Sequence, residues 1–514
     1  MDSSQNLFAA LRAGSPSDPD AVAIETCDSA PPLYYTWRDI DCASARIANL
    51  LASLELPAGA RIAAQTDKSV EALLLYLAVL RAGFVYLPLN SAYQQSELDY
   101  FIGNAEPSVV VCSPRNFPWL STLAFKVGVK NVFTLDDDRS GSLLERAAWH
   151  SDVHDVAVKQ ADDLAAILYT SGTTGRSKGA MLTHGNLLSN ARTLHAYWGW
   201  QASDVLIHAL PVFHVHGLFV ASHGALLAGA KMLWFNRFDP KATIANLPRA
   251  TVFMGVPTLY TRLLAEPGLT RQACASMRVF IAGSAPLLAE TFEAWRERTG
   301  HTIVERYGMS ETVMLTSNPY RAADGERRAG TVGRPLPGVQ LRVHDDKGQP
   351  CATGEVGGIE VKGPNVFKGY WRMPEKTAEE FSTDLWFKTG DVGKLDEHGV
   401  VSIVGRSKDL IISGGYNVYP AEVEGLLNEQ PGVAESAVIG VLHADFGEAV
   451  VAVLVAKPGA VLDAAAVIAE LKHRIANFKV PKRVFVETEL PRNQMGKVQK
   501  NLLRERHKGL FSGT

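Results

Sequence analysis

The first 300 residues alternate between helical and strand-like patterns of apolar positions. Runs with helical length and composition lie at 68–80, 184–198 and 288–298. Short apolar or β-branched runs, which are typical of buried strands, lie at 108–112, 165–169 and 279–282. Because strand and helix patterns follow one another repeatedly, the sequence predicts an α/β architecture with mainly parallel sheets.

The pattern changes after about residue 330. Short, glycine-rich segments with β-forming residues follow, and they predict antiparallel strands in the form of a small β-barrel. A compact α/β segment then ends the chain, with helical patterns at 421–427 and 464–476 and strand patterns at 436–441, 450–456 and 484–487. Polar residues 405–409 separate two apolar strands, so we expect separate domains over 1–405 and 409–514.

Composition narrows the class of protein. The chain has 514 residues, of which 46% are hydrophobic and 20% charged, so we expect a globular protein of several domains. Its net charge of -3 offers no broad electrostatic surface for nucleic acid or for an anionic membrane, and we expect neither partner. Both a monomer and a homodimer remain compatible with the sequence.

Two further features bear on location. The N-terminus begins acidic without an apolar leader, and the apolar stretch at 72–80 is far shorter than the ~20 residues that span a bilayer. The five cysteines are scattered without a C-x-x-C pair, which is typical of reduced thiols rather than disulfides or a zinc site. We therefore expect a cytoplasmic protein.

Candidate ligand-binding residues are most closely spaced at 169–179, YTSGTTGRSKG, between a strand pattern and a helix. Three glycines, among them Gly172, permit close approach of backbone N–H groups to an anion. The hydroxyls and cations that add further donors are Thr170, Ser171, Thr173, Thr174, Arg176 and Lys178. The loop suits a polyphosphate, although a Walker A loop would place glycine directly before the lysine. A solvent-exposed loop without function is the alternative.

Further motifs follow in order along most of the chain. They are Gly283-Ser284-Ala285-Pro286, residues 307–312 (YGMSET), Thr389-Gly390-Asp391, residues 405–409 (GRSKD) and residues 491–497 (PRNQMGK). With the loop at 169–179, they resemble the motifs of the adenylate-forming superfamily of acyl-CoA synthetases, luciferases and peptide-synthetase adenylation domains. The resemblance implies an N-terminal domain of two mainly parallel α/β subdomains and a small β-barrel. It also implies a hinge at 406–408 and a small mobile α/β lid at 409–514.

The resemblance assigns a nucleotide site. Tyr307 would lie against adenine, Asp391 would accept hydrogen bonds from the ribose hydroxyls, and Arg406 would contact ribose or phosphate. The other residues that it implies at the nucleotide are Thr170, Ser171, Gly172, Thr173, Thr174, Lys178, Ser284, Ala285, Gly308 and Thr312. Taken singly, Asp391 could be an ordinary turn residue and Arg406 a surface charge.

Two charged residues are implied in catalysis. A single carboxylate at Glu311, opposite a phosphate loop, suits Mg²⁺, which takes one or two carboxylates together with substrate phosphates. The resemblance makes Lys497 the catalytic lysine, a point charge that bridges the acyl carboxylate and the α-phosphate. Either residue alone would ordinarily be a solvated surface charge.

His214 and His216 form the pattern His-Val-His. On a strand the two side chains would share a face, so a metal site is one interpretation. The resemblance instead places His214 at the mouth of the acyl pocket, as a catalytic and substrate-binding residue, with Val215 and Met309 beside the substrate. For His216 we favour structural packing.

The resemblance also implies a reaction in two steps. Rotation about the hinge residue Lys408 would remove Lys497 and present Gly414, Gly415 and Tyr416 to CoA. The implied substrates and cofactors are an acid, ATP, CoA and Mg²⁺.

Longer runs at 164–184, 363–377 and 493–501 resemble the malonyl-CoA synthetases within this superfamily. The implied acid is malonate, whose second carboxylate would be costly to bury without a cation. A planar guanidinium that binds carboxylate at two points is best suited, and the resemblance places the diacid-binding arginine at Arg278. An arginine that caps a helix or extends from a strand end is the alternative.

Val215, Ala282 and Val313 depart from the malonate-activating pattern. A more apolar wall would admit a 2-methyl group, so methylmalonate is a further candidate acid. Another acyl-CoA synthetase, for a short-chain or aryl acid, and a free-standing adenylation enzyme that loads a carrier protein are the alternative functions. A non-catalytic nucleotide sensor would not need Lys497 and Glu311 intact.

Overall fold

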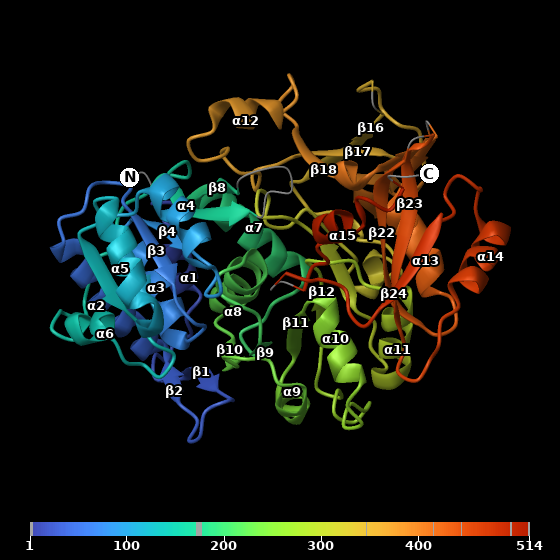
Figure 1. The fold of residues 1–514 in the computed structure, drawn as a ribbon. Coiled ribbons are helices and arrows are strands. Elements are labelled where there is room, and N and C mark those ends of the chain that lie inside the picture. The colour runs from blue at the N-terminus through green and yellow to red at the C-terminus, as the bar shows by residue number, and fades with distance from the viewer. Residues whose placement is uncertain are drawn as a thin grey trace.

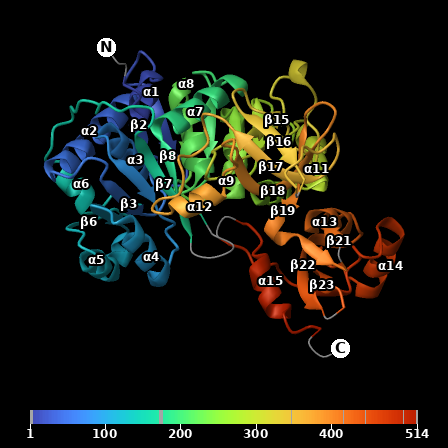
Figure 2. The same ribbon diagram turned by 90° about the horizontal axis from the view of Figure 1, so that it is seen from above.

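A computed structural model places two large α/β sheets side by side, with the C-terminal part of the chain beside them (Figures 1 and 2). The structure describes residues 4–170, 177–345, 347–414, 416–443, 445–493 and 496–511. Figure 2 shows the chain after β19 (Val401–Arg406) as a separate lobe. The two apolar clusters of this lobe draw all their members from residues 411–511, so the lobe has a core of its own.

The first sheet has six strands in the order β6-β5-β3-β4-β7-β8. Its strands are β3 (Arg61–Gln65), β4 (Val85–Pro88), β5 (Val109–Cys112), β6 (Asn131–Thr134), β7 (Leu164–Thr170) and β8 (Lys178–Thr183). Neighbours are parallel except β8, which is antiparallel to β7. The accompanying helices are α2 (Trp37–Ser53), α3 (Val70–Arg81), α4 (Gln95–Ala105), α5 (Phe117–Lys126) and α6 (Ser142–Ala147).

The second sheet has nine strands in the order β15-β14-β13-β12-β11-β9-β10-β1-β2. They are β1 (Val22–Thr26), β2 (Tyr34–Thr36), β9 (Val205–His208), β10 (Lys231–Trp234), β11 (Val252–Gly255), β12 (Val279–Ala282), β13 (Val304–Tyr307), β14 (Thr316–Ser317) and β15 (Arg334–Pro335). Pairing is parallel from β13 through β1. The helices of this part are α1 (Leu7–Ala13), α7 (His184–Tyr197), α8 (Ser222–Ala228), α9 (Pro240–Asn246), α10 (Pro257–Leu264) and α11 (Ala289–Thr299).

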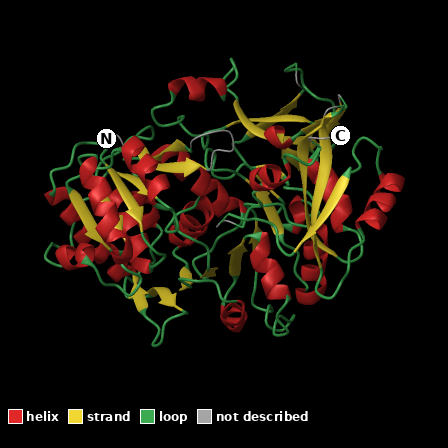
Figure 3. Ribbon diagram, viewed as in Figure 1, coloured by secondary structure: helices red, strands yellow, loops and turns green. Residues whose placement is uncertain are grey.

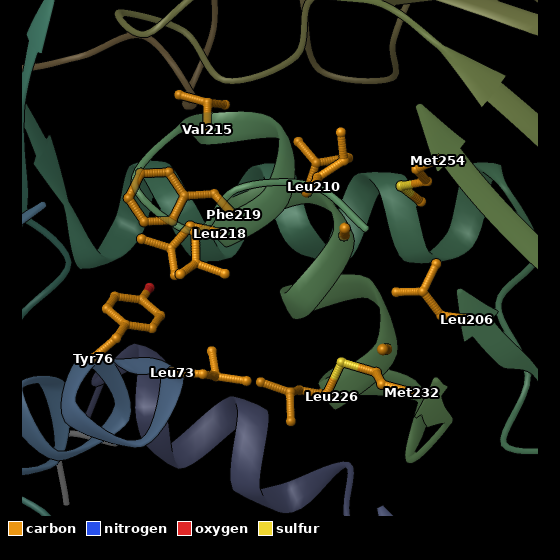
Figure 4. Packing of buried hydrophobic residues seen from close by; sticks show 14 of the residues in the cluster. Leu73, Tyr76, Leu206, Leu210, Val215, Leu218, Phe219, Leu226, Met232 and Met254 are labelled. Carbon is orange, nitrogen blue, oxygen red and sulfur yellow. The ribbon is translucent and has the colours of Figure 1, made fainter. Parts of the chain in front are cut away.

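Helix α3 is buried on every side. Ser69 caps its N-terminus by accepting a backbone N–H of the first turn, and all 12 of its residues are buried. A helix that is apolar all round belongs in the interior of a protein. In Figure 4, Tyr76 faces Phe219 and Leu73 faces Leu226, so α3 packs directly against α8 and the segment before it. One apolar cluster therefore spans both sheets.

The antiparallel region is a four-stranded sheet in the order β16-β17-β18-β19. Its strands are β16 (Gln340–His344), β17 (Gly357–Lys362), β18 (Phe387–Leu395) and β19, and helix α12 (Pro374–Glu379) lies between β17 and β18 in the chain. Strand β19 is also paired on its other side, through an antiparallel bridge between Val401 and Gly333, so the antiparallel region expected after about residue 330 is present.

The C-terminal lobe contains a five-stranded sheet with the path β21-β20-β23-β22 and β24 beside β23. Its strands are β20 (Ile411–Ser413), β21 (Tyr416–Val418), β22 (Val433–His443), β23 (Gly447–Ala456) and β24 (Arg483–Glu487). Its helices are α13 (Pro420–Asn428), α14 (Ala464–Arg474) and α15 (Lys500–His507). Each element that the sequence predicted here is present within a few residues of its expected bounds.

The α/β architecture predicted from the sequence is confirmed (Figure 3). The helix expected at 68–80 is α3, and the strand expected at 279–282 is β12. The described part of the chain contains no helix of the length and apolar character that crossing a bilayer requires.

Candidate active site

Three parallel strands of the nine-stranded sheet point toward one edge. β9 leads toward His214, β12 leads directly into Ser284, and β13 ends at Tyr307. Since carboxyl ends of parallel strands meet at the same edge of a sheet, these residues gather there. Three residues far apart in the sequence thus converge on one region.

Ser284 adopts a backbone conformation that side-chain-bearing residues rarely take, with φ at +72°. Its Oγ lies 3.3 Å from Nδ1 of His216, and half-buried Ala285 follows it. A Cβ at position 283 would stand 2.6 Å from the guanidinium of Arg306, so a larger residue there would displace that side chain. The turn after β12 is therefore pressed between His216 and Arg306.

His214 and His216 lie at the start of a helix rather than on a strand. A π-helix begins at His216 and ends at Ala221, so the strand geometry on which a metal site at the two histidines would depend is not present. Among the residues that the structure describes, no group of three or more His, Cys, Asp and Glu could hold a metal ion. Burial, and then the charges of Lys497 and Arg306, lower the pKa of His214 to about 3, which keeps its imidazole neutral.

Arg306 is a functional candidate that the sequence reasoning missed. The residue is 2% exposed, and its Nε and Nη2 are buried without a hydrogen-bond partner in the described chain. Burial lowers its pKa to about 9, and its charge in turn lowers the pKa of His214 and His216. A desolvated guanidinium with spare donors is complementary to a carboxylate. The available signal was an arginine inside a buried strand, directly before Tyr307.

Arg278 is not brought to this edge of the sheet. It precedes β12, so it lies about 16 Å from the turn at 283, since five strand residues span roughly 3.3 Å each. Its Nε and Nη2 donate to the two carboxylate oxygens of Asp204 at 3.0 and 2.8 Å, and its Nη1 donates to the Trp198 carbonyl at 2.7 Å. The expectation that Arg278 binds the acid does not agree with this position, because Asp204 already occupies the guanidinium.

Tyr307, Asp391 and Arg406 form one hydrogen-bonded group from β13, β18 and β19. The Tyr307 hydroxyl donates to Oδ2 of Asp391 at 2.5 Å, and the Arg406 Nε lies 2.9 Å from Oδ1. Asp391 is 3% exposed, and its charge raises the pKa of Arg406. The structure thus brings together the three residues that were expected at adenine and ribose.

Glu311 is a buried carboxylate whose partner is a tyrosine. The Tyr370 hydroxyl donates to its Oε1 at 2.9 Å. Burial raises the pKa of Glu311, whereas the Tyr370 hydrogen bond and the charges of Lys178 and Arg406 lower it. The ammonium of Lys178 stands 4.2 Å from the centre of the Tyr370 ring and 3.0 Å from Oε1 of Glu380.

The strands of the expected phosphate loop are described, but its tip is not. Thr170 ends β7 and Lys178 begins β8, and the two residues are paired in the antiparallel register. The expected phosphate-binding residues outside the described part are Ser171, Gly172, Thr173 and Thr174. The same holds for Gly415, which was expected at CoA.

The turn that leads to Glu311 is tight. A Cβ on Gly308 would lie 1.9 Å from the Val313 carbonyl oxygen, so only glycine fits there. Thr312 is fully buried and donates its backbone N–H to the Met309 carbonyl at 3.1 Å. Val313 and Val215 are buried too, while Met309 is half-buried. Apolar side chains thus accompany the polar groups of the site.

Lys497 reaches the site from the C-terminal lobe. A Cβ on neighbouring Gly496 would lie 3.5 Å from the hydroxyl of Thr258 in α10, so the loop contacts the larger part of the chain. The side chain keeps access to solvent, but the surrounding protein lowers the pKa of its ammonium. Arg406 lowers this pKa further, and Asp391 opposes the shift.

The remaining expected residues lie on the lobe or at its base. Lys408 lies in a short 3-10 turn, Ser407–Asp409, after β19, and burial lowers its pKa to about 8. Gly414 has φ at +60°, and exposed Tyr416 stacks on the ring of Phe478 with centroids 4.7 Å apart. Neither Gly414 nor Tyr416 has a contact that identifies a ligand.

Comparison with known proteins agrees with this geometry. The family described as "AMP-binding enzyme" matches residues 12–371, and "AMP-binding enzyme C-terminal domain" matches residues 422–497. A malonate–CoA ligase of Arabidopsis thaliana is 36% identical over 485 residues, which cover 87% of this chain and 78% of the relative.

Two crystal structures of MatB from Rhodopseudomonas palustris, both 55% identical, cover 99% of this chain and 100% of their own. The ATP-bound form superposes with a TM-score of 0.95, and the apo form with 0.84. The chain therefore belongs to the family of AMP-binding enzymes.

Proposed function

We propose that this chain is a malonate–CoA ligase. One carboxylate oxygen of malonate attacks the α-phosphorus of ATP, which forms malonyl-AMP and releases pyrophosphate. The thiol of CoA then attacks the activated carbonyl carbon, which forms malonyl-CoA and releases AMP. The similarity to a malonate–CoA ligase supports this assignment.

The observation that carries the proposal is the buried guanidinium of Arg306. Its unpartnered Nε and Nη2 lie beneath the turn at Gly283, near His214 and His216. A monocarboxylic acid would leave this charge uncompensated in the interior, which is strongly unfavourable. A dicarboxylic acid supplies one carboxylate for Arg306 and a second for activation by ATP.

The nucleotide would bind on the other side of the reacting carboxylate. Tyr307 and Asp391 with Arg406 would hold adenosine, and Lys178 would bind the phosphates. A single buried carboxylate at Glu311 fits Mg²⁺, which usually combines one or two carboxylates with substrate phosphates and would neutralise charge on the leaving pyrophosphate.

Lys497 would stabilise the charge that develops between the malonate carboxylate and the α-phosphate. The charges of Arg406, Asp391 and Glu311 act on its ammonium, which supports this role. For the second step, we propose that the lobe turns at Lys408 and that Gly414, Gly415 and Tyr416 then face CoA. One lobe would serve both half-reactions in turn.

Two secondary features belong to this proposal. Val215, Val313 and Ala282 are buried and apolar, which favours methylmalonate as a second, less discriminated substrate. Cys27, Cys42, Cys112 and Cys274 carry free thiols, which supports a cytoplasmic location.

The test is adenylation of a series of acids: malonate, methylmalonate, succinate, acetate and a long fatty acid. We expect pyrophosphate exchange to be fastest with malonate. Arg306→Gln should lower kcat/KM for malonate about 100-fold or more, because the second carboxylate loses its charged partner. The KM for ATP should change little, and exchange with acetate should not fall.

Arg278→Gln is the matched control. This substitution breaks a buried ion pair with Asp204, which is 3% exposed, so we expect a loss of about 3 kcal/mol in the free energy of unfolding. The KM for malonate should remain that of the unmodified chain. Faster exchange with acetate than with malonate, or a malonate KM that depends on Arg278 alone, would refute the proposal.

A further inference from the structure

Residues 368–371 pair with the outer side of β8, the strand that begins with Lys178, and they continue the segment that starts at Asn365. The backbone N–H of Met181 donates to the Gly369 carbonyl at 2.9 Å, and that of Trp371 donates to the Gly179 carbonyl at 2.8 Å. An antiparallel bridge joins Ala180 and Tyr370. The segment is thus fixed to the phosphate-loop hairpin by backbone hydrogen bonds.

The same segment also holds the turn that carries Glu311. The Phe367 N–H donates to the Glu311 carbonyl at 2.8 Å. The side chain of Asn365, which is buried, donates to the carbonyls of Thr312 and Met314 at 2.7 and 3.0 Å. One short segment therefore connects the strand of Lys178 to the turn of Glu311.

Tyr370 repeats this connection at the level of side chains. It is 3% exposed, its hydroxyl donates to Glu311 Oε1, and its ring faces the Lys178 ammonium. Glu380 holds Lys178 from another direction at 3.0 Å. A ring with two rotatable bonds, fixed by burial, thereby orients two flexible charged side chains.

We propose that Tyr370 is a positioning residue for adenylation, one that sets the orientation of the Glu311 carboxylate relative to the Lys178 ammonium. The inference rests on the proposed function, in which Glu311 meets the metal and Lys178 the phosphates. Hydrogen bonds from a second layer of residues commonly fix a metal-binding carboxylate, and their loss costs about 10- to 100-fold in metal affinity. Tyr370 would itself contact neither the nucleotide nor the acid.

The test is Tyr370→Phe in the full-length chain. The substitution removes the hydroxyl but keeps the ring beneath Lys178. Binding of Mn²⁺ in the presence of a non-hydrolysable ATP analogue, measured by electron paramagnetic resonance, needs neither malonate nor CoA. We expect about tenfold weaker Mn²⁺ binding, a higher apparent KM for Mg²⁺ in pyrophosphate exchange, and an unchanged KM for malonate.

Tyr35→Phe is the matched control. The Tyr35 hydroxyl also donates to a buried carboxylate, that of Glu71, at 2.6 Å, but in another part of the fold. This variant should lose stability to a similar extent while binding Mn²⁺ and nucleotide like the unmodified chain.

Two results would overturn the inference alone: Mn²⁺ binding by Tyr370→Phe equal to that of the unmodified chain, or an equal loss of binding in both variants. Failure of the unmodified chain to bind the metal and nucleotide at all would instead refute the proposed function, and the inference with it.

Discussion

Glu305 is a carboxyl group that β13 keeps almost entirely out of water. Its Oε1 accepts the backbone N–H of Leu287 at 3.0 Å, while Oε2 is buried without a partner in the described chain. Burial raises its pKa to about 8, although the Leu287 hydrogen bond opposes the shift. The folded chain therefore keeps this acid protonated at neutral pH, beside the turn that carries Ser284.

This pKa makes a prediction about stability. The folded chain holds a proton on Glu305 between about pH 5 and 8, where the unfolded chain has lost it, so the free energy of unfolding should fall as pH rises through this range. The slope from this group is at most about 1.4 kcal/mol per pH unit. In Glu305→Gln this contribution should be absent. Denaturant titrations of both proteins across the range check this, and parallel pH curves would contradict it.

At the residue scale, the sequence predicted which kinds of side chain the site contains better than where each of them lies in the fold. Tyr307, Asp391 and Arg406 were expected at one ligand and do form one hydrogen-bonded group. Arg278 was chosen and Arg306 overlooked, although each is an arginine at a buried strand. The rule that sites lie at the carboxyl ends of parallel strands already disfavours Arg278, which precedes β12, whereas local sequence does not show that Asp204 neutralises it.

At the element scale, the π-helix His216–Ala221 leaves little room for change. Position 217 must be glycine, because a Cβ there would lie 2.1 Å from the Pro211 carbonyl oxygen. The Gly217 carbonyl accepts from the Ser222 hydroxyl at 2.9 Å, and Nε2 of His208 lies 3.1 Å from it. These contacts fix the helix start, and with it the side chain of His216.

Gly217→Ala should therefore move the helix start. We expect the free energy of unfolding to fall by about 1–3 kcal/mol, as for other overpacked sites, and the KM for malonate to rise. Gly425→Ala is the control, because Gly425 lies in α13 with no atom within 4 Å of its missing Cβ. That change should add about 0.8–1.0 kcal/mol of stability without altering KM. A normal malonate KM in Gly217→Ala would show that the acid does not depend on this helix start.

Elements were predicted well wherever one periodicity dominated. The helix expected at 184–198 is α7, His184–Tyr197, and the strand expected at 165–169 is β7. No element was predicted for the segment that carries the histidines, because its apolar residues fit either period over so short a length. The antiparallel region after about residue 330 was expected and is present, but local pattern does not reveal which strands pair there.

At the scale of the whole molecule, an ion pair between described residues joins the lobe to the larger part of the chain. Nζ of Lys457, which follows β23, lies 2.6 Å from Oε1 of Glu290 in α11. Both side chains are largely exposed, so the pair contributes less than about 1 kcal/mol. A contribution of this size would bias the lobe if, as the proposed function requires, it takes up two positions of similar free energy.

Lys457→Glu should therefore slow malonate-dependent pyrophosphate exchange by a few fold at low salt, since repulsion disfavours the lobe position that delivers Lys497. Conversion of preformed malonyl-AMP to malonyl-CoA should not slow. The double variant Lys457→Glu, Glu290→Lys should regain the lost exchange, and raised salt should reduce the difference. Additive losses in the double variant would rule out a direct contact.

The division of the chain near residue 405 could be predicted from the sequence because a polar segment separates two apolar strands. The position of the lobe could not be predicted, since it depends on weak surface contacts such as that between Lys457 and Glu290. Local sequence does not encode such contacts.

The burial of α3 on all sides has a consequence for how the enzyme discriminates. Tyr76 and its neighbours join the two sheets in a single apolar core, and Lys178 lies on one sheet and Arg306 on the other. In the proposed function, this shared core would fix the distance between the phosphates and the guanidinium, and with it the length of acid that fits. The choice of acid would then depend on the fixed arrangement of the two sheets. Movement of the C-terminal lobe would determine only the order of the two half-reactions.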